Sequence, residues 1–134
     1  MKKILFICEY NRFRSKIAEA IFKKLNKNKK IKVKSAGIIK GSYLDKNQIE
    51  VAKKIGIKLK GQPIGVSTQL LKWQDTIVIA ANDVPQEIFR DNKKYGKKLI
   101  VWKIPDVEDE NKKEIAKIIM SIEKKVKSLI KNSK

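Results

Sequence analysis

Short apolar runs alternate with amphipathic segments along most of the chain. Four of these runs predict buried or half-buried strands, over Lys3–Cys8, Ile31–Ala36, Thr76–Ala81 and Leu99–Trp102. Lysines alternate with smaller residues in Ile31–Ala36, which predicts a strand nearer a sheet edge than the first. Thr76–Ala81 is almost continuously apolar and Leu99–Trp102 repeats that pattern, as strands covered on both faces do.

Apolar residues at helical spacing separate these strands. They predict helices over Ser15–Leu25, Lys46–Lys54 and Lys112–Ile130, and a shorter helix whose N-cap is Ser67. Glycine and proline mark Ile57–Val66 as a loop. Asp83 is expected to cap a further helix, because it begins a capping-box arrangement after the third strand.

Strands that alternate with helices imply a parallel sheet, because right-handed crossovers place successive helices over its faces. We predict an α/β fold of three layers, in which a four-stranded parallel sheet of order 2-1-3-4 has helices on both faces. A chain of 134 residues leaves room for one domain, over residues 1–134. Ligands in such folds bind beyond the carboxyl ends of the strands, so the first place to seek chemistry is the loop after Cys8.

The segment Cys8–Ser15 has the form cysteine, five residues, arginine, serine, and it joins the first strand to the first helix. Five residues can curl into a half-ring whose backbone N–H groups point inward, at the positive end of the helix. A Cys8 thiolate on the floor of this ring would lie under a phosphorus atom, and Arg14 would hold two phosphate oxygens. The loop therefore predicts a phosphate site with a cysteine nucleophile, against the alternative of a buried and inert cysteine.

The other loop residues have predicted parts in shaping the ring and binding the substrate. Ser15 can donate its hydroxyl to the sulfur or cap the helix, and Asn11 can adopt a left-handed backbone and pin the ring through its amide. Arg12 and Arg14 are two of only three arginines among 33 basic residues, which marks a place where guanidinium geometry matters. The predicted substrate-binding residues are Glu9, Tyr10, Asn11, Arg12, Phe13 and Ser15.

Cleavage of a phosphate ester also needs a general acid that protonates the leaving oxygen. Asp106 is the candidate, because it follows the fourth strand and so belongs to the same sheet edge as Cys8. The alternative is a loop aspartate that caps the last helix, although Glu108 and Glu110 are better placed for that role. Asp83 also follows a strand, but as a helix cap we expect it to be structural.

The composition of the chain excludes several kinds of catalytic and metal site. The chain has no histidine and one cysteine, which excludes a Cys/His zinc site, an internal disulfide and a Ser-His-Asp triad, and we expect neither metal nor cofactor. No apolar run reaches about 18 residues, so we expect a cytoplasmic protein with no membrane partner. The net charge of +19 would attract anions, but no aromatic residues interleave with the lysines as a nucleic-acid surface needs.

These residues together resemble the low-molecular-weight protein tyrosine phosphatase family, which includes the thioredoxin-coupled arsenate reductases. The ordered matches are Ile4–Cys8, Asn11, Arg14–Ser15, Ala18–Ala20, Ser35–Gly37, Ile77–Asp83 and Trp102–Asp106. The resemblance implies a metal-independent phosphomonoesterase with a cysteinyl-phosphate intermediate, in which Cys8 is the nucleophile, Arg14 binds phosphate and Asp106 is the acid. It implies a phosphotyrosine protein or a small aryl phosphate as substrate, and we expect a monomer.

The chain departs from the family pattern at the substrate slot. Tyr10 stands where the family has glycine, and Val107–Glu108 follow the acid where the family has Pro-Tyr. Tyr10, Phe13 or Tyr43 would then supply the missing wall of the slot. Two other functions stay open: arsenate reduction with an external thiol, since the chain has no second cysteine, and a basic nucleic-acid-binding module.

Overall fold

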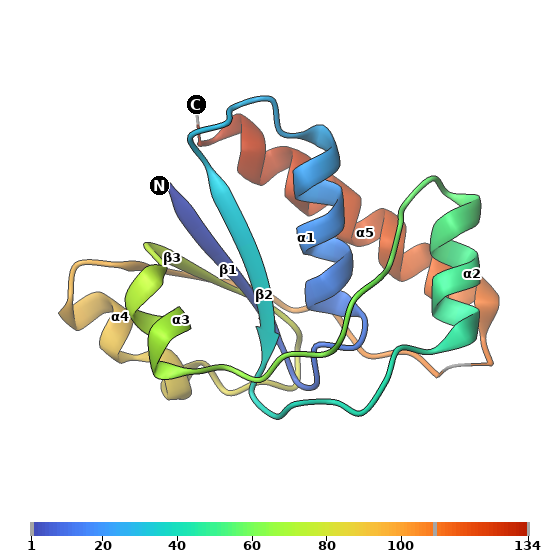
Figure 1. The fold of residues 1–134 in the computed structure, drawn as a ribbon, viewed down its shortest axis with the longest axis horizontal. Coiled ribbons are helices and arrows are strands. Elements are labelled where there is room, and N and C mark those ends of the chain that lie inside the picture. The colour runs from blue at the N-terminus through green and yellow to red at the C-terminus, as the bar shows by residue number, and fades with distance from the viewer. Residues whose placement is uncertain (1, 109, 134) are drawn as a thin grey trace.

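The computed structural model describes residues 2–108 and 110–133, and it forms one parallel sheet with helices on both faces (Figure 1). The strands are β1 (Lys3–Cys8), β2 (Lys32–Gly37), β3 (Thr76–Ala80) and β4 (Lys98–Trp102). Their order across the sheet is β2-β1-β3-β4, and every neighbouring pair is parallel. The predicted α/β fold and its 2-1-3-4 order are confirmed.

The described residues also form five α-helices and one 3-10 turn, of which all but the last helix lie between strands in the sequence. They are α1 (Arg14–Leu25), α2 (Lys46–Lys54), α3 (Thr68–Trp73), η1 (Gln86–Phe89), α4 (Asp91–Lys94) and α5 (Lys112–Lys131). Side chains of Asp45, Ser67 and Asn111 cap α2, α3 and α5 by accepting a backbone N–H of the first turn. The predicted strands and the helices α1, α2 and α5 agree with the structure to within one residue at each end.

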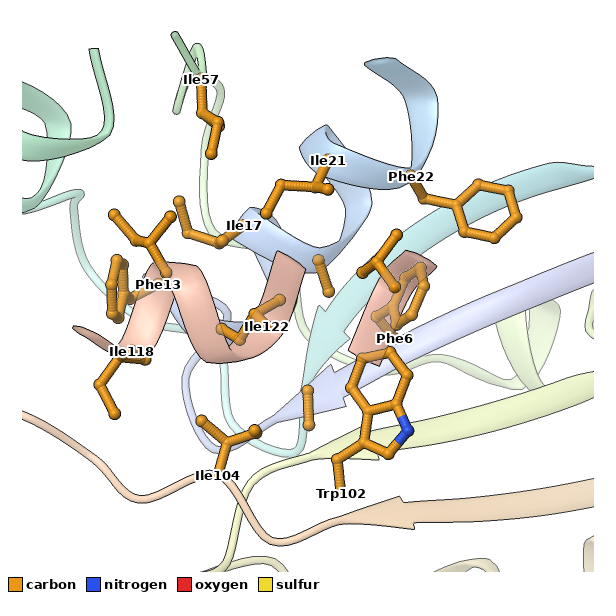
Figure 2. Close-up of a cluster of buried hydrophobic side chains, with 14 of the residues drawn as sticks. Phe6, Phe13, Ile17, Ile21, Phe22, Ile57, Trp102, Ile104, Ile118 and Ile122 are labelled. Atoms are coloured by element: carbon orange, nitrogen blue, oxygen red, sulfur yellow. The ribbon is translucent and has the colours of Figure 1, made fainter. Parts of the chain in front are cut away.

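The larger hydrophobic core lies between the sheet and the pair of helices α1 and α5 (Figure 2). Three aromatic rings form its centre: Phe6 of β1 lies between Phe22 of α1 and Trp102 of β4, with ring centroids 6.1 and 5.8 Å away. Burying each such side chain contributes roughly 1.5–3 kcal/mol to folding. This core fixes the direction in which α1 leaves the end of β1.

The opposite face of the sheet is covered by α3 and η1. Leu70 and Trp73 of α3 and Phe89 of η1 pack with the second apolar row of β1 and β3. These two strands are buried along nearly their whole length, as the apolar run of β3 predicted. The same prediction is wrong for β4, because β4 is an edge strand and its residues 99–101 are only half-buried.

The expectation that Asp83 caps a helix is also wrong. Pro85 stands at the N-terminus of η1, and no side chain caps that turn. Because all four strands are parallel, the loops after β1, β3 and β4 lie at the same, carboxyl end of the sheet. Asp83 lies in the loop after β3, at this end. Among the described residues, no helix has both the length and the apolar character that crossing a membrane requires.

Candidate active site

The loop between β1 and α1 begins at Cys8, the last residue of β1. Cys8 is 3% exposed, and the loop after it turns through Asn11, whose φ of 56° lies in the left-handed region. Asparagine adopts this conformation more readily than most residues. Among the described residues other than glycine, Asn11 alone has a positive φ, so Tyr10 fits an ordinary backbone conformation in the position where glycine was expected.

A chain of hydrogen bonds runs from the sulfur into the protein. The Asn11 Nδ2 group donates to Ser15 Oγ at 2.8 Å and to Ser35 Oγ at 3.0 Å, and Ser35 Oγ donates to a Glu19 carboxylate oxygen. Ser15 Oγ lies 2.9 Å from Cys8 Sγ. Ser15 also accepts from Asn11, and its own hydroxyl can either donate to the sulfur or accept from a thiol there.

Neighbouring backbone holds the loop from outside. The N–H groups of Ile38, Ile39 and Gly41 donate to the carbonyls of residues 8, 9 and 10 at 3.0–3.1 Å. Ile64 N–H donates to Asn11 Oδ1 at 2.9 Å, so the Asn11 side chain, which is fully buried, is bonded on both its amide groups. Residue 37 must be glycine, because a Cβ there would lie 2.6 Å from the Tyr10 carbonyl carbon.

Arg14 is 4% exposed and is held by two elements that follow later strands. Its Nη1 group donates to the Ile104 carbonyl at 3.0 Å, and its Nη2 group lies 3.0–3.1 Å from both carboxylate oxygens of Asp83. A buried cation needs such partners, because desolvation without them is costly. Sequence reasoning missed this function of Asp83, although its place after β3 was a signal that could have found it.

Asp106 lies on the exposed loop after β4, where its Oδ1 accepts the Val107 N–H at 2.9 Å. The helix cap that was the alternative for Asp106 is provided by Asn111. The pKa of Tyr10 is raised, mainly by its hydrogen bond to Glu9 and by that charge, and further by Asp83 and Asp106. Tyr10, on the Cys8 loop itself, therefore feels the charges of Glu9, Asp83 and Asp106.

The remaining predicted residues have different environments. Arg12 donates to the Tyr43 carbonyl at 2.7 Å and lies over the Tyr43 ring, 5.3 Å from its centroid. Tyr10 and Tyr43 are 42% and 66% exposed, and both can contact a substrate. Phe13 points into the core beside α1 and α5 (Figure 2) and is 4% exposed, so its side chain is not available as a wall of the slot, contrary to expectation.

The site combines one thiol, a buried guanidinium and carboxylates. Within residues 2–108 and 110–133, no group of three or more His, Cys, Asp or Glu side chains is placed to hold a metal ion. A guanidinium has the chemistry to bind an oxyanion, and a thiol has the chemistry to act as a nucleophile.

Comparison with known proteins gives a consistent result. A family model described as low molecular weight phosphotyrosine protein phosphatase matches residues 3–134. No curated protein matches the sequence. Among solved structures, the YwlE arginine phosphatase from Geobacillus stearothermophilus is 21% identical, with a TM-score of 0.83, and 98% of this chain and 92% of that chain are covered.

Two further structures have the same fold. A low molecular weight protein tyrosine phosphatase from T. tengcongensis is 23% identical with a TM-score of 0.83, and covers 98% of this chain and 99% of its own. An arsenate reductase from Archaeoglobus fulgidus is 25% identical with a TM-score of 0.74, and covers 95% of this chain and 98% of its own.

Proposed function

Because this chain belongs to the low molecular weight phosphotyrosine protein phosphatase family, and is therefore a phosphatase, we propose that it hydrolyses phosphomonoesters through a phosphoryl group carried on Cys8. The observation that carries the proposal is the 2.9 Å contact between Ser15 Oγ and the Cys8 sulfur, in which we propose that the hydroxyl donates. A donor aimed at the sulfur favours the ionised form that attacks phosphorus.

In the first step, the Cys8 thiolate attacks phosphorus in line with the ester oxygen. A sulfur–phosphorus bond forms, the phosphorus–oxygen bond breaks, and Asp106 gives its proton to the leaving oxygen. Asp106 suits this role because it lies on an exposed loop at the edge of the sheet where Cys8 ends. The products are the free alcohol or phenol, a cysteinyl phosphate and an ionised Asp106.

In the second step, water attacks the cysteinyl phosphate. Asp106 takes a proton from the water, the sulfur–phosphorus bond breaks, and inorganic phosphate leaves the thiolate behind. The Ser15 hydroxyl stabilises the thiolate again as the sulfur becomes the leaving group. Both steps use Cys8 and Asp106. The second step regenerates the Cys8 thiolate and returns a proton to Asp106, both of which the first step consumed.

Arg14 binds the phosphate oxygens during both steps. Asp83 bonds Nη2 and the Ile104 carbonyl bonds Nη1, so two loops hold the guanidinium, and we propose that its remaining N–H groups bind the ligand. We propose that Asp83 acts as a positioning residue, which keeps the guanidinium directed at the loop before phosphate arrives. Loop amides complete the contacts to the equatorial oxygens.

The proposed substrates are phosphotyrosine proteins and small aryl phosphates, with the exposed rings of Tyr10 and Tyr43 flanking the ester group. Arsenate reduction is the second candidate, since one structurally similar protein is named an arsenate reductase. Cys8 is the only cysteine, so that reaction would need an external thiol to release arsenite. A cytoplasmic location and a monomeric state stay predictions.

A substrate panel tests the proposal. Aryl, tyrosyl, seryl and sugar phosphates are compared in the wild type and in Cys8→Ser, with vanadate as inhibitor, and arsenate turnover with thioredoxin or glutathione is measured beside them. We expect turnover of aryl and tyrosyl phosphates that vanadate inhibits and that Cys8→Ser lacks. Full activity in Cys8→Ser, or arsenate turnover without phosphatase turnover, would reject the proposal.

A further inference from the structure

The outer edge of β2 carries backbone groups that no neighbouring strand uses along most of its length. Gly37 turns its N–H and C=O away from β1, to Ile64 and Val66, at 2.8 Å each. Because alternate residues of a parallel strand bond to the same side, Val33 and Ser35 turn theirs outward as well. On that side, none of the residues that the structure describes bonds to the backbone of Val33 or Ser35.

The chain itself begins a fifth strand at this edge and then diverges from it. Gly65 forms an isolated parallel bridge with Gly37. Residues 56–63, which precede that bridge, pass along α1 instead, where Lys24 donates to the Gly56 carbonyl at 2.8 Å (Figure 1). The place that a fifth strand would take beside Val33 and Ser35 is therefore left open.

Two cavities occupy this place. They measure about 1010 and about 440 Å³, and they share Lys23, Val33 and Lys34 as lining residues. Their lining residues come from α1, from β2, from the segment 56–64, and from α3 with Ser67 before it. Together they form a channel along residues 31–35 of the β2 edge, which we name the β2 channel.

The channel is strongly basic. Eight lysines line the two cavities, against one lining carboxylate, Glu19. That carboxylate is already bonded to Lys23 at 2.8 Å and to Ser35. Between the lysines lie apolar side chains such as Ile57, Ile64 and Leu70. A surface of this kind fits a ligand that has both negative charges and apolar groups.

Lys16 is a buried cation in the wall of the channel. The residue is 7% exposed, lines the larger cavity, and makes no hydrogen bond or ion pair with any residue that the structure describes. Burial lowers the pKa of its ammonium group and Lys23 lowers it further, and Glu19 and Cys8 offset this only partly. A carboxylate entering the channel would give this buried cation the partner that it lacks.

We propose that the β2 channel binds an extended acidic peptide segment of a partner protein, which joins the sheet as a fifth strand beside β2. Backbone hydrogen bonds to Val33 and Ser35 would provide affinity, and acidic side chains would pair with the lysines of the channel. A nucleic acid fits less well, because the larger cavity has no aromatic lining residue and Lys34 covers the Trp73 ring of the smaller one, 4.7 Å from its centroid. The proposal is independent of the chemistry at Cys8.

Fluorescence anisotropy tests the proposal with a labelled peptide of about ten residues in which glutamate and threonine alternate, long enough to span the strand. A second peptide has the same sequence with N-methyl groups on alternate residues, which keeps every charge and removes half of the backbone donors. Single-stranded RNA and polyphosphate of equal charge serve as competitors.

Two charge-reversal variants locate the binding. Lys34→Glu with Lys60→Glu changes exposed lysines of the channel, and Lys124→Glu with Lys125→Glu makes the same change of charge on exposed positions of α5. Neither pair belongs to the Cys8 site, so turnover of an aryl phosphate in both variants provides the control for folding. Hydrogen exchange at Val33 and Ser35 reports pairing along the edge directly.

We expect N-methylation and the channel variant each to weaken peptide binding about tenfold or more, which corresponds to about 1.4 kcal/mol. We expect the α5 variant to stay within about threefold of wild type, and the peptide to protect the Val33 and Ser35 amides from exchange. Equal binding of the two peptides, equal losses in the two variants, or tighter binding of RNA or polyphosphate would overturn the proposal. Loss of peptide binding with phosphatase turnover intact separates this site from the Cys8 site.

Discussion

The Cys8 loop and the β2 channel both gather cations around neighbouring strands, but they hold them in different ways. In the loop the cations are arginines with directional partners: Arg14 bonds Asp83 and the Ile104 carbonyl, and Arg12 bonds the Tyr43 carbonyl. In the channel the cations are lysines, and Lys16 has no bonded partner among the described residues. The loop therefore fixes a geometry, whereas the channel provides mainly a positive potential from ammonium groups, only some of which, such as Lys23 and Lys24, have bonded partners.

The largest expected effect comes from replacing an arginine of the Cys8 loop by lysine, with the reverse replacement in the channel as its control. Arg14→Lys keeps the charge but loses the planar group that bonds Asp83 and that we propose binds phosphate, and we expect kcat/KM for an aryl phosphate to fall by about a hundredfold or more. Lys34→Arg in the channel is the matched control, and steady-state kinetics should find it unchanged. Comparable rates for Arg14→Lys and wild type would mean that charge alone suffices in the loop.

A smaller effect is expected where the loop and the channel meet. Gly37 pairs with residues 64–66 at the end of the channel, and its Cα faces the backbone of Tyr10 and Asn11. In Gly37→Ala the new Cβ must push the loop away, so kcat/KM should fall at least about tenfold. Gly65→Ala lies across the same bridge, where a Cβ would meet only Lys40 at 3.4 Å.

Steady-state kinetics measure the activity of Gly37→Ala and Gly65→Ala, and thermal unfolding shows whether each variant is folded. We expect Gly65→Ala to retain activity and both variants to stay folded. A folded Gly37→Ala with normal kinetics would show that the loop tolerates displacement, and the contrast between a fixed loop and an adaptable channel would fail.

The smallest effect concerns stability and not activity. Lys16→Met removes a desolvated ammonium and keeps the apolar stem, so the free energy of unfolding should rise by on the order of 1 kcal/mol at neutral pH, measured by urea denaturation. Because the pKa of Lys16 is lower in the folded state than the usual 10.5, its penalty is complete below the folded value and disappears as pH rises toward 10.5. The advantage of Lys16→Met should shrink over that range, and an advantage that grows there would contradict this account.

Most of the fold could be predicted because its signals are local. The apolar run at Lys3–Cys8 and the helical spacing in Lys46–Lys54 each depend on adjacent residues, and both matched the structure at both ends. The exposure of β4 could not be predicted in this way, since an edge position depends on which strands pair and not on the strand's own composition.

In the candidate site, too, features that depend on adjacent residues could be predicted, whereas contacts between residues far apart in sequence could not. The contact between Ser15 and the Cys8 sulfur and the left-handed backbone of Asn11 are features that the loop sequence allowed, because the loop is continuous in sequence. The pairing of Arg14 with Asp83 joins residues 69 positions apart, and local pattern had assigned Asp83 to a helix cap. The position of Phe13 in the loop suggested contact with substrate. Its side chain instead packs into the core with residues of α1 and α5.

Trapping the phosphorylated enzyme tests the central claim most directly. Asp106→Asn is mixed with an aryl phosphate that has a good leaving group, quenched rapidly, digested and analysed by mass spectrometry. Because the second step needs the Asp106 carboxylate, we expect one phosphoryl group to accumulate on the peptide that contains Cys8, and none in Cys8→Ser. A phosphoryl group on another residue, or release of phosphate at the normal rate with no phosphorylated Cys8, would contradict the account.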